Sequence, residues 1–213
     1  MRDMWFAVIA LLALAGPLPA VAQAAMTTPS TAAMASALKL TPDDRILGKP
    51  DAPVTIIEYA SLTCPHCAHF AVDVLPKLKA KWIDTGKAKL ILRDYPLDEP
   101  AAHAAMIARC AAPEKFYALI DTFFKDQQQW GLAKDREAAL QRLALLGGIS
   151  KSAFDTCLAD KSVEDKVLQS RLTATKDLDV EATPTFFING VKFDGAPEEE
   201  PMDTAIAHAA QGH

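Results

Sequence analysis

Two cysteines separated by two residues are the feature of this sequence with the most specific chemistry. They form the run Cys64-Pro65-His66-Cys67, which follows a short apolar stretch. Residues i and i+3 are neighbours on a helix, so cysteines at this spacing can close a small disulfide ring. If Cys64 opens the helix, its sulfur lies where main-chain N–H groups are unpaired and the helix dipole is positive. This position favours the thiolate, and a stabilised thiolate makes the corresponding disulfide an oxidant.

A structural disulfide and half of a metal site are the alternatives for this pair. A zinc site needs two further ligands, for which Cys110, Cys157, His69 and His103 are available. No second C-x-x-C run accompanies them. Redox chemistry is therefore the preferred interpretation of this pair. A protonated or hydrogen-bond-donating His66 would further stabilise the Cys64 thiolate.

The elements around the pair follow an α/β order. Residues 54–59 (VTIIEY) are rich in β-branched side chains and predict a strand buried on both faces. Residues 64–81 carry apolar side chains at helical spacing, with Pro65 suited to the first turn and Pro76 expected to kink or split the helix. Residues 88–93 predict a second strand, and this order is consistent with a right-handed βαβ unit.

The rest of the chain divides into a helical stretch and a final hairpin. Residues 99–174 carry apolar residues at helical spacing, and Ser150 is a candidate N-cap within them. Residues 185–193 predict a hairpin around an Asn-Gly turn. Residues 42–98 and 175–213 therefore form one mixed α/β domain, and residues 99–174 form a helical insert.

The amino terminus indicates an exported protein. An apolar run from Trp5 to Ala15 follows Arg2 and precedes helix-breaking and small residues, which is typical of a cleavable signal peptide over residues 1–25. Residues 26–41 are rich in Ala, Thr and Ser without a clear period, and we expect a flexible lead-in. After export the compartment is oxidising, so thiols can pair there.

Composition excludes two classes of protein. The net charge of −5, from 22 basic and 27 acidic residues, argues against a general nucleic-acid binder, which would carry a basic surface. No apolar run reaches 18 residues, which argues against a multi-span membrane protein. A hydrophobic content of 50% is enough to bury a core.

A threonine-proline pair supports the redox interpretation. Thr183-Pro184 directly precedes the third predicted strand, where a proline fits a tight turn and can be cis. Beside the cysteines, such a loop leaves a main-chain edge free to pair with an extended polypeptide. An ordinary proline at the start of a strand is the alternative.

Taken together, these motifs resemble the DsbA-like thiol:disulfide oxidoreductases. The resemblance covers roughly residues 42–210 and implies a thioredoxin fold with an inserted helical subdomain. It also implies an exported dithiol oxidase that needs no cofactor or metal, acts on reduced, unfolded exported proteins and is reoxidised by a DsbB-like membrane quinone reductase. The runs that carry it are DRILG at 44–48, DAPV at 51–54, EY at 58–59, CPHC at 64–67 and TPT at 183–185.

The resemblance assigns roles to single residues. Cys64 matches the exposed attacking cysteine and Cys67 its buried partner. Within the dipeptide Pro65-His66, the histidine matches the residue that tunes the thiolate. In Thr183-Pro184, the proline matches a cis-proline and the threonine the residue before it.

Glu58 matches a buried acid of the preceding strand. Alternation places it on the same face as Val54 and Ile56, an apolar face where the pKa of a carboxyl group rises. Such a group can carry a proton to or from Cys67. The alternative is an acid at the end of a strand that reaches solvent.

Thr183 leaves an alternative function open, because a threonine at this position also occurs in related disulfide isomerases. The dimeric isomerases carry an N-terminal dimerisation domain, whereas here only a short segment precedes the α/β domain. We therefore expect a monomeric, periplasmic oxidase that forms a mixed disulfide at Cys64. An isomerase or reductase of the same fold is the first alternative, and a metal-binding module is the second.

A second cysteine pair lies in the insert. Cys110 and Cys157 fall on separate predicted helices, and in an oxidising compartment we expect them to form a structural disulfide. Closing such a loop stabilises a fold by about 4 kcal/mol at most. Two buried free thiols are one alternative. A bridge that regulates the active pair is another, and some alphaproteobacterial members of the family carry such an extra pair.

Overall fold

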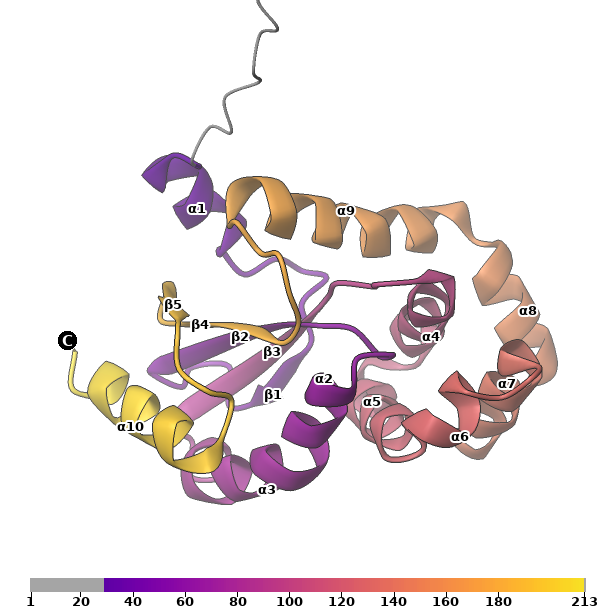
Figure 1. Ribbon diagram of the computed structural model, residues 1–213, viewed down its shortest axis with the longest axis horizontal. Helices are drawn as coiled ribbons and strands as arrows, with labels where there is room; N and C mark the ends of the chain where they lie inside the picture. Colours follow the sequence, from indigo (N-terminus) through magenta and orange to yellow (C-terminus); the bar gives the residue numbers. More distant parts are fainter. Residues whose placement is uncertain (1–28, 213) are drawn as a thin grey trace, which may run out of the picture.

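The computed structural model describes residues 29–212, so the expected signal peptide at 1–25 lies outside the described residues. A five-stranded sheet in the order β1-β3-β2-β4-β5 forms its centre, with helices on both faces and a group of helices to one side (Figure 1). This arrangement confirms the expected α/β fold with inserted helices. The strands are β1 (Ile46–Gly48), β2 (Val54–Ala60), β3 (Ala88–Asp94), β4 (Thr185–Ile188) and β5 (Val191–Phe193).

The strand that leads to the cysteines is central. β2 pairs with β3 in parallel and with β4 antiparallel, and every residue of β2 except Thr55 is buried. The predicted hairpin is also present, since Asn189 and Gly190 both have positive φ, as a tight two-residue turn requires. β1 was not predicted, because this three-residue edge strand lies in a stretch interrupted by proline and glycine.

One face of the sheet is covered by the helix that carries the cysteines and by α10 (Glu199–Ala210). The first of these is segmented: α2 (Pro65–His69) and α3 (Leu75–Leu78) are separated by a π-helical turn, and a second π turn follows α3. Pro76 lies next to the first π turn, where the wider turn accommodates a residue without an N–H group. The expected kink or split at Pro76 thus takes the form of a local widening, because the chain stays helical from Pro65 to Ile83.

The opposite face is covered by the end of α9 (Lys161–Asp177) and by α1 (Thr31–Ala37) (Figure 1). α1 lies within residues 26–41, so the expectation of a flexible lead-in is wrong for this part. Ser30 caps the helix, and the side chains of Met34 and Ala37 pack against the core of this face. Met34 and Ala37 are three residues apart, which places both on one side of this short helix, and both are half-buried there.

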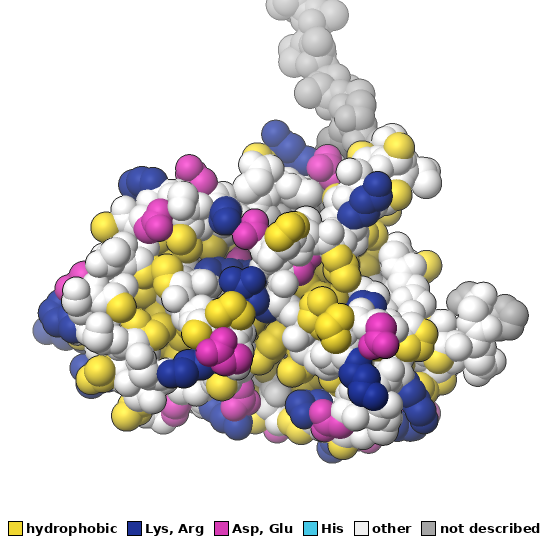
Figure 2. All heavy atoms as spheres, turned by 180° about the vertical axis from the view of Figure 1, so that it is seen from behind, with side chains coloured by type: hydrophobic (Ala, Val, Ile, Leu, Met, Phe, Trp, Pro, Cys, Tyr) yellow, Lys and Arg dark blue, Asp and Glu magenta, His cyan; other side chains and the backbone are white. Residues whose placement is uncertain are grey.

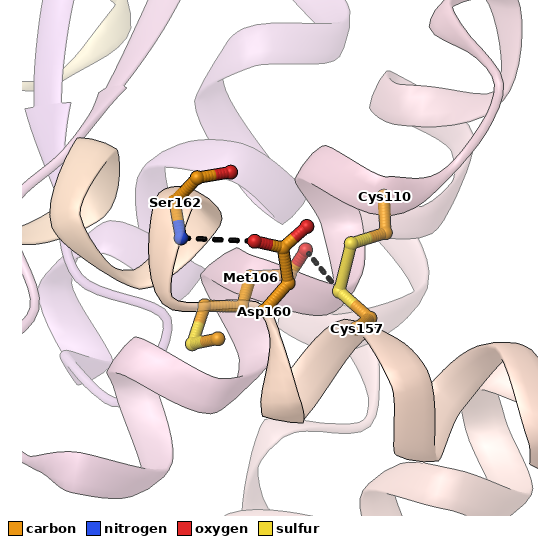
Figure 3. The surroundings of a disulfide bond; sticks show 5 residues. All are labelled: Met106, Cys110, Cys157, Asp160 and Ser162. Atoms are coloured by element: carbon orange, nitrogen blue, oxygen red, sulfur yellow. Dashed lines mark hydrogen bonds between the residues drawn. A yellow bond between two sulfur atoms is a disulfide. The ribbon is translucent and has the colours of Figure 1, made fainter.

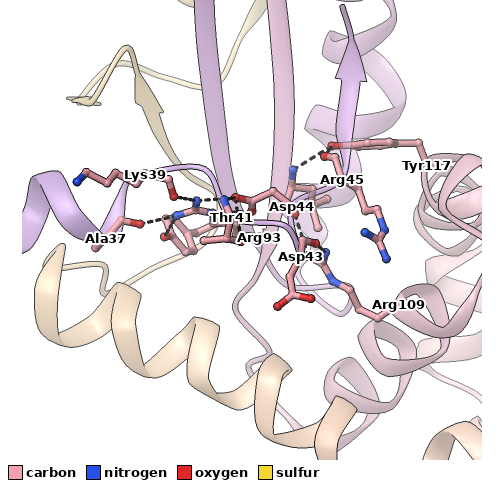
Figure 4. A network of polar contacts seen from close by, with 11 residues as sticks. Ala37, Lys39, Thr41, Asp43, Asp44, Arg45, Arg93, Arg109 and Tyr117 are labelled. Atoms are coloured by element: carbon pink, nitrogen blue, oxygen red, sulfur yellow. Dashed lines mark hydrogen bonds and ion pairs between the residues drawn. The ribbon is translucent and has the colours of Figure 1, made fainter. Parts of the chain in front are cut away.

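Arg93 attaches this amino-terminal segment to the sheet (Figure 4). Its Nε and Nη2 donate to the two carboxylate oxygens of Asp44, both at 2.9 Å. Nη1 donates to the carbonyl oxygen of Ala37 at 2.6 Å and to the hydroxyl of Tyr59 at 3.0 Å, and Nη2 donates to Lys39 O at 2.8 Å. Burial alone would raise the pKa of Asp44, but the hydrogen bonds from Arg93 and Thr41 hold it below its usual value.

The inserted helices lie between β3 and β4 and have a core of their own. They are α4 (Glu99–Cys110), α5 (Phe116–Lys125), α6 (Gln127–Gly131), α7 (Arg136–Leu146), α8 (Lys151–Ala159) and the first part of α9. Ser150 caps α8 as predicted, since its hydroxyl accepts a hydrogen bond from Ala153 N. The expected insert boundary at residue 174 falls inside α9, because that helix continues from the insert onto the sheet.

The surface has no large region of one charge on the face drawn in Figure 2, where acidic and basic side chains are interspersed. This pattern agrees with the modest net charge of −5. Within residues 29–212, no helix combines the length and apolar character needed to cross a membrane.

Candidate active site

Cys64 is the N-cap of α2, and the local sequence explains why the helix begins there. Its backbone is extended (φ −80°, ψ 121°), and Pro65 occupies the first helical position, where no N–H group is needed. The carbonyl oxygen of Cys64 accepts the first helical hydrogen bond, from Ala68 N at 3.1 Å. Both Cys64 and Cys67 are free thiols, so the structure describes the reduced pair.

The two sulfurs differ less in exposure than the sequence led us to expect. Cys64 is 5% exposed and Cys67 is fully buried. The description of Cys64 as an exposed cysteine is therefore wrong, because the loop at Thr183 covers it: Cys64 Sγ lies 3.3 Å from the carbonyl oxygen of Thr183. Cys64 is nevertheless the one cysteine of the pair that has any accessible surface.

Hydrogen bonds lower the pKa of Cys64 to about 5. The largest contribution comes from the thiol of Cys67, and burial opposes it. The side chain of Thr183 and the main-chain N–H groups of Cys67 and His66 add to the lowering. His66 thus acts through its backbone in this structure, while its imidazole lies exposed beside Pro65.

Thr183 and Pro184 are joined by a cis peptide bond, as the sequence allowed. The thiol of Cys64 can donate to the carbonyl oxygen of Thr183, whereas Thr183 Oγ1 is buried without a hydrogen-bond partner among the described residues. A thiolate has no proton to donate and can only accept. The side chain of Thr183 lowers the pKa of Cys64.

Glu58 and Cys67 form the buried side of the site. Glu58 is 1% exposed on β2, between Phe186 on β4 and Leu92 on β3, so it does not reach solvent as the alternative proposed. Burial, followed by the negative charge of Cys64, raises its pKa to about 8. Burial also raises the pKa of Cys67, and the hydrogen bond to Cys64 and the charge of Glu58 add to this effect. Both groups are therefore protonated at neutral pH.

The second cysteine pair forms a disulfide between the end of α4 and α8 (Figure 3). The Cα atoms of Cys110 and Cys157 are 6.2 Å apart, within the usual range for a disulfide. Cys157 is buried, with its sulfur 3.1 Å from the carbonyl oxygen of Met106, whereas Cys110 is exposed. The alternative of two free thiols does not apply to this structure.

Among the described residues, His69 and His103 have acidic neighbours outside the cysteine pair. His69 lies between Asp73 and Glu198, and the nearest carboxylate of His103 belongs to Glu99. In the part of the chain that the structure describes, no three His, Cys, Asp or Glu side chains are placed to hold a metal ion.

Sequence reasoning missed the residues that hold the loop before the cysteines. Gln127, at the start of α6, donates to the carbonyl oxygens of Leu62 and Cys64. Thr63 Oγ1 donates to Asp98, the N-cap of α4, at 3.1 Å. Nothing in the sequence marks Gln127, which stands in a run of three glutamines at a helix start.

Comparison with known proteins agrees with this geometry. The sequence model of the family described as Thioredoxin matches residues 40–208. A Rickettsia bellii protein that bears the name protein-disulfide oxidoreductase is 30% identical over 175 residues, which are 82% of this chain and 68% of that protein. A Rickettsia typhi protein of the same name is 33% identical over 156 residues, or 72% of this chain and 57% of that protein. The chain thus spans about two thirds or less of the length of these relatives.

Among solved structures, alpha-DsbA1 of Wolbachia pipientis is similar in sequence and in fold. It is 35% identical, superposes with a TM-score of 0.77, and the match covers 83% of this chain and 96% of that one. A Bacillus cereus protein that bears the name disulfide bond formation protein D is 30% identical over 153 residues, or 68% of this chain and 69% of that protein.

Proposed function

This chain belongs to the thioredoxin family, as a disulfide oxidoreductase of the DsbA type, and we propose that it is a periplasmic oxidase that donates its Cys64–Cys67 disulfide to newly exported proteins. The ionisation of the two sulfurs supports this role most directly. The pKa of Cys64 is lowered to about 5 while that of Cys67 is raised. A thiolate stabilised in the reduced form makes the disulfide prone to accept electrons.

The reaction begins when a substrate thiolate attacks Cys64 Sγ of the disulfide. The Cys64–Cys67 bond breaks, a mixed disulfide forms at Cys64, and Cys67 leaves with the electron pair. Because the Cys67 thiolate is buried, it requires a proton, and Glu58 with a pKa of about 8 is a donor within electrostatic range.

A second substrate thiolate then attacks the substrate sulfur of the mixed disulfide. Cys64 leaves as the thiolate, and leaving is fast because its pKa is low. Glu58 takes a proton back from solvent. The substrate has gained a disulfide, and the protein has gained two electrons and one proton, with Cys64 ionised and Cys67 protonated. No cofactor takes part in this exchange.

The proposed role also specifies where the protein acts and with which partners. The apolar amino terminus acts as a cleavable signal peptide, and the protein works as a monomer on reduced, unfolded exported proteins. The edge beside Thr183-Pro184 and Cys64 receives the substrate as an extended strand. A DsbB-like membrane quinone reductase accepts the two electrons and restores the disulfide.

Refolding of reduced RNase tests the proposal. The oxidised protein should restore RNase activity, and the Cys64→Ala variant should lose this ability because no mixed disulfide can form. Equal refolding with both proteins would contradict the proposal. Repair of scrambled RNase in the same assay separates the two functions, since faster repair than oxidation would identify an isomerase instead.

A further inference from the structure

Gln127 of the helical insert contacts the main chain on both sides of Thr63, directly before the active-site helix. Its side chain is 8% exposed, and Nε2 donates to Leu62 O and to Cys64 O, both at 2.9 Å. An amide nitrogen carries two protons, so each proton serves one carbonyl oxygen. Since both neighbours can only accept, the orientation of the amide is fixed by its surroundings.

These contacts fix the peptide groups that carry the reactive sulfur. The carbonyl oxygen of Cys64 accepts from Ala68 N at 3.1 Å as well as from Gln127, so the helix and the insert hold it together. Leu62 is 3% exposed, and without Gln127 its buried carbonyl oxygen would lose this donor. Burying an unpaired acceptor is costly, so the loop would move to find another partner.

The insert also contacts the loop at a second, more exposed point. Thr63 Oγ1 donates to Asp98 Oδ1 at 3.1 Å, and the same oxygen accepts from Ala101 N at 2.9 Å in the first turn of α4. Asp98 is exposed, so water can replace this contact at little cost. Gln127 is buried, and its two hydrogen bonds have no such replacement.

We infer that Gln127 is a positioning residue for the redox reaction: from the insert, it holds the loop geometry on which stabilisation of the Cys64 thiolate depends. The inference rests on the proposed function in that Cys64 and Cys67 are the redox pair. The stabilising N–H groups of His66 and Cys67 are fixed in α2, so a shift of the Cys64 peptide changes their distance to the sulfur. The carbonyl oxygens of Leu62 and Cys64 would also lose the donor that they share.

The Gln127→Met variant tests this role, because methionine keeps the length of the side chain and removes both donors. We expect the thiolate titration of Cys64, followed by ultraviolet absorbance, to move upward by about one pH unit. The equilibrium constant with glutathione should shift about tenfold toward the oxidised protein, which is about 30 mV for a two-electron couple. The reduced form should lose more stability than the oxidised form in urea.

Tyr117→Phe is the matched control. The hydroxyl of Tyr117 contacts Arg45 O, Leu90 O and Leu92 N, and none of these belongs to the active-site loop. This variant should lose stability equally in both redox forms and keep the wild-type titration of Cys64. Equal loss in both forms of Gln127→Met, with an unchanged titration, would show a merely structural role and overturn the inference.

Gln127→Glu covers the case in which the methionine variant does not fold. A protonated carboxyl offers one donor to the two carbonyl oxygens and an ionised one offers none, so its potential should deviate further from wild type as pH rises. A constant deviation would overturn the inference. The titration of wild-type Cys64 tests the proposed function independently of the variants. Ionisation near pH 9 in the wild type would contradict the proposed function itself.

Discussion

The Cys67 thiol, the side chain of Thr183 and the main-chain N–H groups of α2 lower the pKa of Cys64, while burial opposes its ionisation. The donors prevail, and the pKa falls from 9.0 to about 5. Each pKa unit is worth about 1.4 kcal/mol. Because the effect depends on fixed donors, it belongs to the folded, reduced protein and is absent from the disulfide form.

The redox potential should therefore change its dependence on pH near pH 5. Above that value reduction takes up two electrons and one proton, since Cys64 stays ionised, and the potential should fall by about 30 mV per pH unit. Below it both sulfurs take up a proton, and the slope should double to about 59 mV per unit. Equilibration with glutathione between pH 4 and 8 measures both slopes, and a single steep slope up to pH 8 would contradict the low pKa.

Glu58 should make the reduced protein less stable as pH rises. The unfolded carboxyl group loses its proton near pH 4.5 and the folded one near pH 8, so the folded state binds more protons between these values. The contribution of Glu58 to the free energy of unfolding should fall by about 1.4 kcal/mol per pH unit in this window, or by about 3 kcal/mol between pH 4.5 and 7. In the reduced protein the lowered pKa of Cys64 acts in the opposite direction above pH 5, so the contribution of Glu58 is the difference between wild type and a variant without this carboxyl group. Urea unfolding of wild type and Glu58→Gln measures the difference.

Glu58→Gln should lack this contribution, because glutamine does not ionise, so wild type should lose stability relative to Glu58→Gln as pH rises. Glu114→Gln removes an exposed carboxyl group instead and should keep the wild-type slope. In oxidised wild type Cys64 cannot ionise, so its opposing contribution is absent and the decline caused by the buried Glu58 should appear directly. Parallel curves for wild type and Glu58→Gln would show that the Glu58 carboxyl group is ionised in the folded protein at neutral pH.

At the scale of elements, the sequence predicted those whose signal is local. The β-branched run of β2, the Asn-Gly turn, the Ser150 cap and the effect of Pro76 each depend on a few adjacent residues. β1 and α1 are too short for periodicity to detect, and long-range contacts stabilise them: β1 pairs with β3, and α1 packs beside α9.

The same distinction applies to the site. The sequence was enough to predict the redox pair, from the spacing of Cys64 and Cys67. It was also enough to predict a buried Glu58, from the apolar residues that alternate with it. The donors at Gln127 could not be predicted, because 63 positions separate it from Cys64 and only the packing of α6 brings the two together. The polar network around Arg93 could not be predicted for the same reason, since its partners lie 34 to 56 positions away, in the segment before β1 and on β2.

Asp44→Asn tests that anchoring network. Asparagine keeps the shape of Asp44 but leaves Arg93 as a buried cation without its counter-ion, which typically costs about 3–5 kcal/mol. We expect a loss of this size in urea unfolding at pH 7. Because the pKa of Asp44 is lowered in the folded state, the loss should shrink as pH falls through that lowered value.

Asp43→Asn is the neighbouring control. Asp43 pairs with Lys166 at 2.9 Å on the surface, where ion pairs are worth less than about 1 kcal/mol. The double variant Asp44→Asn, Arg93→Met should lose less free energy of unfolding than Asp44→Asn alone, because it leaves no unpaired charge buried. Similar small losses for Asp44→Asn and Asp43→Asn would show that the segment before β1 contributes little to the fold.

At the scale of the whole molecule, the insert and the sheet meet at the active site. The apolar cluster that contains Cys64 and Cys67 is formed largely by side chains of α4 to α8, including Phe116, Phe123 and Trp130. The Cys110–Cys157 disulfide joins α4 and α8 of this same group. Loss of this disulfide can therefore have two effects. It can lower the stability of the insert, and it can change the environment of Cys64 and Cys67.

Replacing Cys110 and Cys157 together with serine separates these two effects. A structural bridge across 47 residues should contribute about 4 kcal/mol at most, mainly by restricting the unfolded chain. That contribution is the same whether Cys64 and Cys67 are oxidised or reduced, so urea unfolding should show equal losses in both forms and an unchanged glutathione equilibrium. An unequal loss, with a matching shift in that equilibrium, would instead identify a bridge that regulates the active pair.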